Sequence, residues 1–260
     1  MNTVKQLKNR IIDNNFFRPS WYSIFINPYF INRYSLYSAI NRFASSMSQN
    51  TSIPVGDNSG PALHYKILDI GCGKKPYKDL FAGEEYIGID IQGGGHTDSE
   101  KTVNAYYDGT KIPFKDQTFD ITICTQVLEH ADDANALIAE CSRVMKPDAK
   151  LFLTMPFVYP EHEIPFDFRR FTKFGHEKIC KENGLNIVEI QKTTGLFGTF
   201  AQLLSLGIFE GIPFKASVLK TLLTIIILMP IQLLGIILDI IFRKAGPTMD
   251  YVVVAKKRKQ

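Results

Sequence analysis

Two glycines and two acids, placed around two short apolar runs, have the residue types and the spacing of a ligand-binding site. Gly71 and Gly73 follow the apolar run 66–70. Asp69 lies inside that run, and Asp90 closes the next one, seventeen residues after Gly73. Glycines let a strand turn sharply into a helix and let the backbone approach a ligand that a Cβ would exclude. An acid at the carboxyl end of a second strand can accept hydrogen bonds from both hydroxyls of a ribose. The spacing therefore predicts a site for a nucleoside cofactor.

Neighbouring residues distinguish between two cofactors that are both bound by such glycine turns. A nicotinamide dinucleotide fingerprint has a small residue three positions after its second glycine, whereas Pro76 stands there in this chain. Asp69, two residues before Gly71, suits a ligand that carries an ammonium group rather than a diphosphate. S-adenosylmethionine carries such a group. The pattern favours S-adenosylmethionine, and a nicotinamide-dependent oxidoreductase is the less favoured alternative.

Further motifs follow in a fixed order along the chain. They are Phe119-Asp120, Leu128-Glu129-His130 and Met145-Lys146-Pro147-Asp148-Ala149, after Asp69-Ile70-Gly71-Cys72-Gly73. With these four motifs, residues 67–156 resemble the class I S-adenosylmethionine-dependent methyltransferases, in particular the methyltransferase type 11-like bacterial group. Two features depart from the family pattern. The last motif ends in Asp-Ala rather than Gly-Gly, and Lys74-Lys75-Pro76 stands where many members carry a third glycine.

The resemblance implies a cofactor and the residues that hold it. In that family the acid ending the second strand binds ribose, which points to Asp90, and an acid after the third strand contacts the adenine amino group, which points to Asp108. The expected cofactor is S-adenosyl-L-methionine, and the expected binding residues are Asp69, Gly71, Cys72, Gly73, Asp90, Ile91, Asp108, Gly109 and Gln126. The implied activity is transfer of a methyl group to a small-molecule, glycan or lipid-linked acceptor.

Two histidines are the candidates for catalysis. In-line methyl transfer gains much of its rate from alignment and proximity, but an oxygen acceptor also needs its proton removed. His130 follows the fourth predicted strand and His162 lies after the fifth, and either could act as a general base near neutral pH. The alternative for His130 is a loop residue that only shapes the cofactor cleft.

The loop around His162 carries further charged residues. Arg169 and Arg170 could hold a phosphate or carboxylate of the acceptor, or they could pair with the acids of the same loop, Glu161, Glu163 and Asp167. A metalloprotease zinc motif needs a second histidine four residues after the first on a continuous helix, whereas position 166 is Phe and Pro165 breaks the helix. No metal site is expected.

Alternating apolar runs and helical patterns indicate how these residues are brought together. Such alternation is typical of a parallel sheet covered by helices. We expect strands at 66–70, 86–90, 102–106, 119–124, 149–155, 185–191 and 251–255. One helix should begin after Asp132 or Asp133, and another after Thr172. The predicted fold class is α/β, a Rossmann-like seven-stranded methyltransferase sheet with helices on both faces, an N-terminal helical extension and a hydrophobic helical insertion before the last strand.

The chain divides by composition into four segments. We expect an N-terminal helical extension and linker at 1–60, the cofactor-binding core at 61–194, the hydrophobic insertion at 195–247, and the last strand with a basic tail at 248–260. The extension is crowded with aromatic residues between positions 16 and 43. They could form a lid over the cofactor or pack against the edge of the sheet.

The insertion contains the most apolar part of the chain, residues 218–242, which is long enough to span a bilayer. A single span would place its ends on opposite sides, although the strands on either side of it belong to one sheet. Pro230 divides the run, which predicts a helical hairpin that dips into one leaflet, with the headgroups contacted by Lys215, Lys220, Arg243 and Lys244. The alternative is an element buried in a dimer or against the domain, which Gln232 and Asp239 favour.

Composition bounds the remaining possibilities. The 260 residues carry a formal net charge of +4, partly in the tail 256–259, without a basic stripe interleaved with aromatics, so no nucleic-acid partner is expected. The four cysteines have neither metal spacing nor a pairing pattern, which indicates reduced thiols.

We expect a cytoplasmic protein at the cytoplasmic face of a membrane, contacting it through 215–244. A membrane-attached scaffold that binds the cofactor without turnover is the alternative outside the enzymes.

Overall fold

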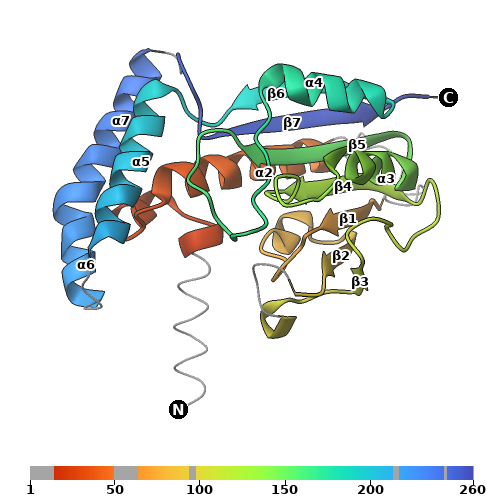
Figure 1. Ribbon diagram of the computed structural model, residues 1–260, viewed down its shortest axis with the longest axis horizontal. Coiled ribbons are helices and arrows are strands. Elements are labelled where there is room, and N and C mark those ends of the chain that lie inside the picture. Colours follow the sequence, from red (N-terminus) through yellow and green to blue (C-terminus); the bar gives the residue numbers. More distant parts are fainter. Residues whose placement is uncertain (1–14, 50–63, 94–97, 213–216, 243–244, 260) are drawn as a thin grey trace, which may run out of the picture. The chain divides into compact units, whose positions relative to one another are not determined.

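The structure is a computed structural model and describes residues 15–49, 64–93, 98–212, 217–242 and 245–259. The expectations for residues 1–14 and 50–63, and for Lys215, Arg243 and Lys244, lie outside the described residues. The strands in chain order (Figure 1) are β1 (Lys66–Ile70), β2 (Glu85–Ile91), β3 (Ala105–Tyr107), β4 (Phe119–Thr125), β5 (Met145–Pro156), β6 (Leu185–Lys192) and β7 (Asp250–Lys257).

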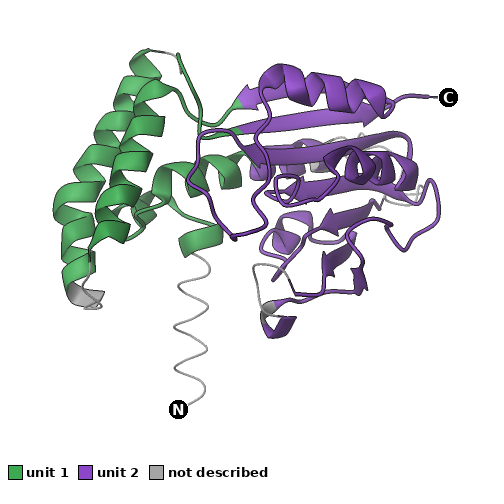
Figure 2. Cartoon of the chain, viewed as in Figure 1, with its two compact units in different colours: residues 1–39, 192–250 green, residues 40–191, 251–260 purple. Residues whose placement is uncertain are grey.

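The helices are longest near the two ends of the chain. They are α2 (Phe30–Gln49), α3 (Ala134–Val144), α4 (Lys173–Glu182), α5 (Leu196–Gly211), α6 (Ser217–Leu223) and α7 (Met229–Ile241). Single turns are η1 (Trp21–Phe25), η2 (Lys78–Phe81), η3 (Asp98–Glu100) and the π-helical η4 (Thr224–Leu228). The chain divides into two compact units, residues 1–39 with 192–250 and residues 40–191 with 251–260 (Figure 2).

The seven strands form one sheet in the order β3-β2-β1-β4-β5-β7-β6. The neighbours β1–β2, β1–β4, β2–β3 and β4–β5 are parallel. The last two strands run antiparallel, because Arg258 N donates to Gly184 O at one end and Thr193 N donates to Asp250 O at the other. The predicted seven-stranded α/β fold is confirmed.

Two strands begin more than one residue away from their predicted starts. β3 begins at Ala105 rather than at 102, because Ala105 is the first residue that pairs with β2. Before it, Thr102 N donates to Gly73 O of the glycine turn and Asn104 N to Gly88 O of β2. β5 begins at Met145 rather than at 149, because Met145 already pairs with Phe119 across a bulge. Local sequence does not show either of these long-range hydrogen-bond partners.

The core of the second unit lies on both faces of the central strands, as expected for parallel strands that are buried on both sides. Alternate residues of β5 point to opposite faces. Leu151 and Leu153 belong to the buried cluster that includes Leu137 of α3, whereas the ring of Phe152 packs on Phe43 of α2 at 5.0 Å between centroids. Packing against the sheet therefore accounts for Phe43, the last aromatic of the N-terminal extension.

The helices α3 and α4 begin as predicted. Asp133 is the cap of α3 and accepts hydrogen bonds from Asn135 N and Ala136 N, and the Thr172 hydroxyl of α4 accepts one from Gly175 N. Such caps satisfy amide groups that have no partner inside the helix.

In the first unit, the predicted division of the apolar run at Pro230 is wrong, because Leu219–Ile241 is a single 23-residue helix. The π-helical turn η4 explains why proline is tolerated. Met229 N donates to Thr224 O, five residues back, and this widened turn lies directly before the proline ring. Instead, α5 and this helix form the two antiparallel arms of a hairpin. The start of α5 meets the end of α7, where Phe197 N donates to Asp239.

Candidate active site

The glycine turn after β1 is shaped by close packing on one side and open space on the other. Gly71 and Gly73 have φ values of +65° and +49°, a region that disfavours side chains. A Cβ on Gly71 would overlap the side chain of Val127. A Cβ on Gly73 would meet no described atom within 4 Å. The backbone at Gly73 is therefore exposed to whatever ligand enters this turn.

Asp90 anchors the glycine turn to β2. Its Oδ2 accepts a hydrogen bond from Gly73 N at 2.9 Å, and its Oδ1 accepts one from Ile91 N at 2.8 Å. The ammonium group of Lys101 lies 3.5 Å from Oδ1 and also donates to the carbonyl oxygens of Ile91 and Gly93. The carboxylate thus lies at the carboxyl end of β2 beside the open glycine, which is the position a ribose-binding acid requires.

Asp69 is buried below the same turn. The Tyr86 hydroxyl donates to its Oδ2 at 2.7 Å. Burial raises the pKa of Asp69 to about 7, despite the opposing effects of the Tyr86 hydrogen bond and the charge of Lys75. A cationic ligand group nearby would favour the ionised form and offset part of this cost.

Packing under the turn depends on a glycine that the sequence patterns did not single out. A Cβ on Gly88 would lie 2.6 Å from Cys72 Sγ and would also overlap the side chain of Lys75. Burial raises the pKa of the Cys72 thiol to about 12, so it stays protonated. Cys72 therefore fills space beside β2 rather than acting as a nucleophile.

Asp108, the residue predicted to contact adenine, lies in the loop after β3, and this loop meets the end of β2. A Cβ on Gly109 would lie 3.7 Å from the side chain of Ile91, which places the loop after β3 beside the end of β2. The Asp108 Oδ1 accepts hydrogen bonds from Thr110 N, the Thr110 hydroxyl and Lys111 N. These hydrogen bonds lower the pKa of Asp108 to about 2, so the carboxylate is ionised.

Gln126 marks the same edge of the sheet at the end of β4. Its backbone N donates to Thr154 O at 3.0 Å and its side-chain Nε2 donates to the Thr154 hydroxyl at 3.1 Å. The side-chain amide is therefore held against β5. The predicted cofactor residues all lie in or beside the loops at the carboxyl ends of β1 to β4, where ligands bind in open α/β sheets.

His130 and His162 meet next to the buried carboxylate of Glu129. Their ring centroids lie 4.8 Å apart in an edge-to-face arrangement. Glu129 Oε1 lies 3.8 Å from His130 Nε2 and 4.0 Å from His162 Nε2. The sequence motif contained Glu129, but it was not predicted as a site residue.

Backbone oxygens define the protonation pattern of the two rings. His130 Nδ1 lies 2.9 Å from Phe166 O, and His162 Nδ1 lies 3.3 Å from Pro160 O and 3.2 Å from Asp167 Oδ2. Because these partners only accept hydrogen bonds, a neutral ring at either position carries its proton on Nδ1 and presents an Nε2 lone pair. Two lone pairs and a carboxylate oxygen thus converge, an arrangement that can receive a proton. The three donor atoms lie within 4.8 Å of one another, so they could also hold a metal ion.

Both arginines of the loop are engaged within the protein. Arg170 forms a two-point pair with Asp167 and, as the largest influence, lowers the pKa of that acid to about 2. Arg169 donates to the carbonyl oxygens of Leu128, Ala131 and Asp132. Of the two sequence interpretations, pairing inside the loop describes Arg170, and Arg169 fastens the loop to the segment after β4.

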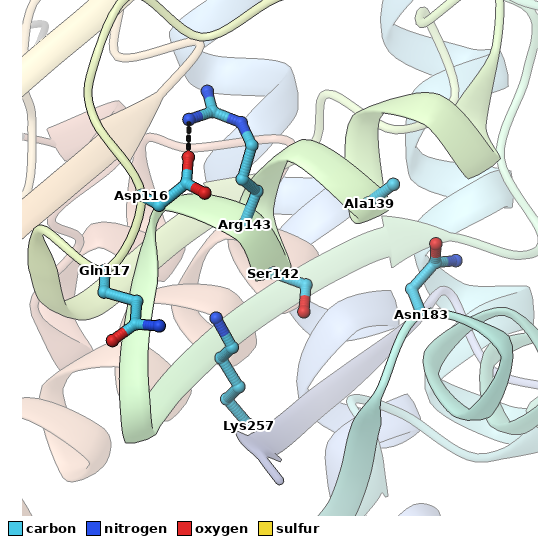
Figure 3. A pocket seen from close by; sticks show the side chains of 7 residues that line it. All are labelled: Asp116, Gln117, Ala139, Ser142, Arg143, Asn183 and Lys257. Atoms are coloured by element: carbon cyan, nitrogen blue, oxygen red, sulfur yellow. Dashed lines mark hydrogen bonds and ion pairs between the residues drawn. The ribbon is translucent and has the colours of Figure 1, made fainter. Parts of the chain in front are cut away.

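A separate pocket of about 290 Å³ lies at the opposite edge of the sheet (Figure 3). It is lined by Asp116, Gln117, Ala139, Ser142, Arg143, Asn183 and Lys257. Gln117 precedes β4, so the pocket faces the amino ends of the parallel strands, away from the glycine turn. Arg143 is paired with Asp116 and, along its own helix, with Glu140. None of the predicted site residues lines this pocket.

Comparison with known proteins connects this geometry with a family. Residues 68–153 match a family model described as a methyltransferase domain. The ubiquinone biosynthesis O-methyltransferase of Aliivibrio fischeri is 26% identical over 111 residues, which is 38% of this chain and 47% of the relative. The protein of the same description from Hahella chejuensis is 30% identical over 102 residues, 34% and 42% respectively. The chain thus spans less than half the length of these curated relatives.

Solved structures share the fold at low sequence identity. A SAM dependent methyltransferase from Archaeoglobus fulgidus has a TM-score of 0.51 at 15% identity, covering 95% of this chain and 99% of that one. A putative sarcosine dimethylglycine methyltransferase from Galdieria sulphuraria has a TM-score of 0.52 at 15% identity, covering 85% and 86%. At this identity the likeness establishes the fold.

Proposed function

We propose that the chain is an S-adenosylmethionine-dependent methyltransferase whose acceptor atom is a hydroxyl oxygen, because residues 68–153 match a family model described as a methyltransferase domain. The acceptor class is a small molecule, a glycan or a lipid-linked hydroxyl compound. The curated relatives are named as O-methyltransferases of ubiquinone biosynthesis, which supports an oxygen acceptor.

The residues of the glycine turn fit the proposed cofactor. The open space beside Gly73 leaves room for the ligand, and Asp90 lies next to it for the ribose hydroxyls. Asp69, buried and with its pKa raised to about 7, gains a counter-charge from an ammonium group. Ile91 and Gly109 come together where an adenine ring would lie. The bound cofactor would supply an electrophilic methyl group on a positively charged sulfur.

His162 is the proposed general base. Its Nδ1 is held by Pro160 O and by the ionised Asp167, so the lone pair that accepts a proton lies on Nε2. Burial and the neighbouring His130 lower the pKa of His162 below its ordinary value, which keeps it neutral at pH 7. Asp167 and Glu129 would stabilise the imidazolium once the acceptor proton has moved to Nε2.

The observation that supports this base assignment best is the convergence of His130 Nε2, His162 Nε2 and Glu129 Oε1. His130 Nε2 is buried and has no hydrogen-bond partner among the described residues, whereas the side chain of His162 is partly exposed. We therefore assign His130 to positioning and charge balance and His162 to proton acceptance.

The test is methyl transfer from labelled S-adenosylmethionine to a panel of phenols, polyprenylated phenols and glycans by the full chain. His162→Gln should remove transfer to the preferred hydroxyl acceptor while leaving cofactor affinity within twofold. His64→Gln is the matched control, because His64 is an exposed histidine whose Nδ1 contacts Gly83 O. Cofactor binding without transfer to any acceptor would support a scaffold, and transfer that survives His162→Gln would contradict the base assignment.

A further inference from the structure

From Leu222 onward, the long helix Leu219–Ile241 has its polar side chains on the inside and most of its apolar side chains on the outside. Between Leu222 and Phe242 the polar residues are Thr224, Gln232 and Asp239, and all three are buried. Every exposed side chain in that stretch is apolar. Ile226 and Ile240 are 68% and 72% exposed. A surface helix of a water-soluble protein has the opposite arrangement.

The neighbouring helix α5 repeats this arrangement. Thr199, Gln202 and Ser205 are buried, whereas Phe200 and Leu204 are exposed. Glu210 is the exposed acid of this helix, and it lies in the last turn, where its carboxylate accepts a hydrogen bond from the Tyr29 hydroxyl. Both arms of the hairpin therefore turn polar groups inward over most of their length.

Two of the inward polar groups, the side-chain amides of Gln202 and Gln232, have specific partners inside the first unit. Gln202 accepts from Asn32 N and donates to Pro28 O, and Gln232 accepts from Ile31 N and donates to Asn27 O. These amides satisfy backbone groups of the N-terminal segment. Hydrogen bonds of this kind hold helices together when no water is available to replace them.

Asp239 joins the two arms of the hairpin at its base. The amino end of α5 has no cap from its own side chains, and Asp239 of α7 accepts from Gly195 N at 2.6 Å and from Phe197 N at 3.1 Å. Glycines allow this approach, since a Cβ on Gly198 would overlap the Asp239 carboxylate and one on Gly235 would overlap Ala201. Small residues at a close helix crossing are typical of helices that pack in lipid.

We propose that the hairpin of α5 and the helix Leu219–Ile241 is inserted in a lipid bilayer, which covers its outer face. The outer face is formed by exposed side chains that include Phe200, Leu204, Ile226, Leu234, Ile237 and Ile240. The long helix is strongly apolar, and only 22% of its most apolar 18 residues are buried in the protein. A core helix of equal hydropathy would be mostly buried.

Length and charge agree with a bilayer. The 23 residues of the long helix measure about 35 Å at 1.5 Å per residue, against a hydrocarbon thickness of about 30 Å. In the sequence, Arg243 and Lys244 come two and three residues after the end of the helix, and basic residues near helix ends commonly meet lipid headgroups. Because the two arms are antiparallel, the chain enters and leaves the membrane on one side.

A bilayer fits the outer face better than a second copy of this chain. Protein interfaces combine an apolar centre with a polar rim and hydrogen bonds. The exposed residues between Leu222 and Phe242 offer no side-chain hydrogen-bonding group over the whole stretch. Lipid tails make no demand for such groups.

The first test is flotation of the detergent-purified full chain with vesicles of phosphatidylcholine and phosphatidylglycerol. The wild type should float. The double variant Ile226→Gln with Ile240→Gln should reduce the floated fraction at least fivefold, because it places two amides on the outer face. Phe174→Gln with Val188→Gln is the control, because these side chains are equally exposed, at 74% and 63%, but belong to the other unit. Wild-type protein that stays dimeric and unbound after detergent removal would overturn the proposal.

A second test does not depend on solubility differences between variants. Trp21 is the one tryptophan in the sequence, so Trp21→Phe gives a background without tryptophan. In that background, the fluorescence of Ile240→Trp should be quenched by lipids brominated on their acyl chains, and that of Val188→Trp should not. Equal quenching of both reporters, or of neither, would contradict insertion of the hairpin. Neither test uses methyl transfer, so its outcome is independent of the proposed enzymatic function.

Discussion

His130 and His162 lie edge to face with their centroids 4.8 Å apart, and each directs Nε2 toward the carboxylate of Glu129. The two residues come from loops after different strands, 32 positions apart in the sequence. Their Nδ1 atoms lie against Phe166 O and Pro160 O, so the neutral form of each ring carries its proton on Nδ1. The proposed proton transfer depends on this relationship.

Removal of the proposed base should affect turnover rather than binding. We expect His162→Ala to lower kcat by about 10²-fold to 10⁴-fold, the usual contribution of a general base. Because the pKa of His162 is lowered, the wild-type kcat at saturating cofactor should be level near pH 7 and fall only below about pH 6.5, the ordinary pKa of histidine. Initial-rate measurements across pH give the answer. An unchanged profile in the variant would contradict the assignment.

The same donor atoms provide a test for metal dependence. If they exchange protons alone, dialysis against a chelator should leave methyl transfer unchanged. The prediction is wrong if activity disappears on chelation and returns with one divalent metal. A parallel measurement on Glu129→Gln would then show whether the restored activity needs this carboxylate.

Cofactor affinity should depend on pH through Asp69. Its pKa is about 7, so the acid is increasingly protonated below that pH, and binding of an ammonium group must release the proton. Affinity should fall by up to about tenfold per pH unit between pH 7 and 5.5. Calorimetry of the wild type and of Asp69→Asn measures this, and the variant should lose the slope. A retained slope would assign it to another group.

The predicted loss of cofactor affinity at low pH cannot result from loss of folding stability through Asp69. The folded-state pKa of Asp69 is raised above the ordinary value of 3.8, so the folded state binds the proton more tightly than the unfolded chain. Titration of Asp69 therefore makes the unliganded fold more stable as the pH falls from 7 toward 4. Thermal unfolding without cofactor over this range serves as the control.

Alanine substitutions at the two glycines of the turn should affect different properties of the protein. Gly71→Ala places a Cβ against Val127 and should destabilise the fold, whereas Gly73→Ala meets no described atom and mainly narrows the space for the ligand. We expect Gly73→Ala to lose about 1 kcal/mol of stability from its positive φ. Its cofactor affinity should fall much further. Gly71→Ala combined with Val127→Ala should recover stability, and failure to recover would show that backbone strain dominates.

Asp239 should contribute more to stability than an ordinary helix cap. Asp239→Ala leaves Gly195 N and Phe197 N without their acceptor in a buried position, which costs about 1 to 3 kcal/mol per unsatisfied group. Asp133→Ala, which removes the cap of α3, should cost about 1 kcal/mol. Chemical unfolding in detergent compares the two variants. Equal losses would argue that Asp239 is readily replaced by water.

Local sequence was sufficient for the parts of the site that depend on neighbouring residues. The glycine turn, Asp90 at the end of β2 and the caps Asp133 and Thr172 follow from short-range patterns, and the structure has them in the expected elements. The alternation of apolar runs likewise predicted the seven-stranded sheet. These features depend on backbone geometry within a few residues.

Features that depend on distant partners were not predictable in this way. Lys101 beside Asp90 and the close contact of Gly88 with Cys72 join segments that no local pattern connects. Glu129 belongs to the Leu128-Glu129-His130 motif, but the motif does not reveal that Glu129 lies near His162. That proximity arises because Arg169 binds the loop of His162 to the backbone of Leu128. The prediction that Pro230 divides the apolar run was wrong, because a π-helical turn in the preceding residues accommodates the proline ring within a continuous helix.

The measurement that tests the central claim most directly is calorimetric titration of the full chain in detergent with S-adenosylmethionine and, separately, with NADH. The account predicts one site for S-adenosylmethionine, no binding of NADH, and at least a tenfold loss of S-adenosylmethionine affinity in Asp90→Asn, which keeps the shape of the side chain. Thermal unfolding of the variant checks that the glycine turn remains folded. Binding of NADH, or unchanged S-adenosylmethionine affinity in a folded Asp90→Asn variant, would contradict the account.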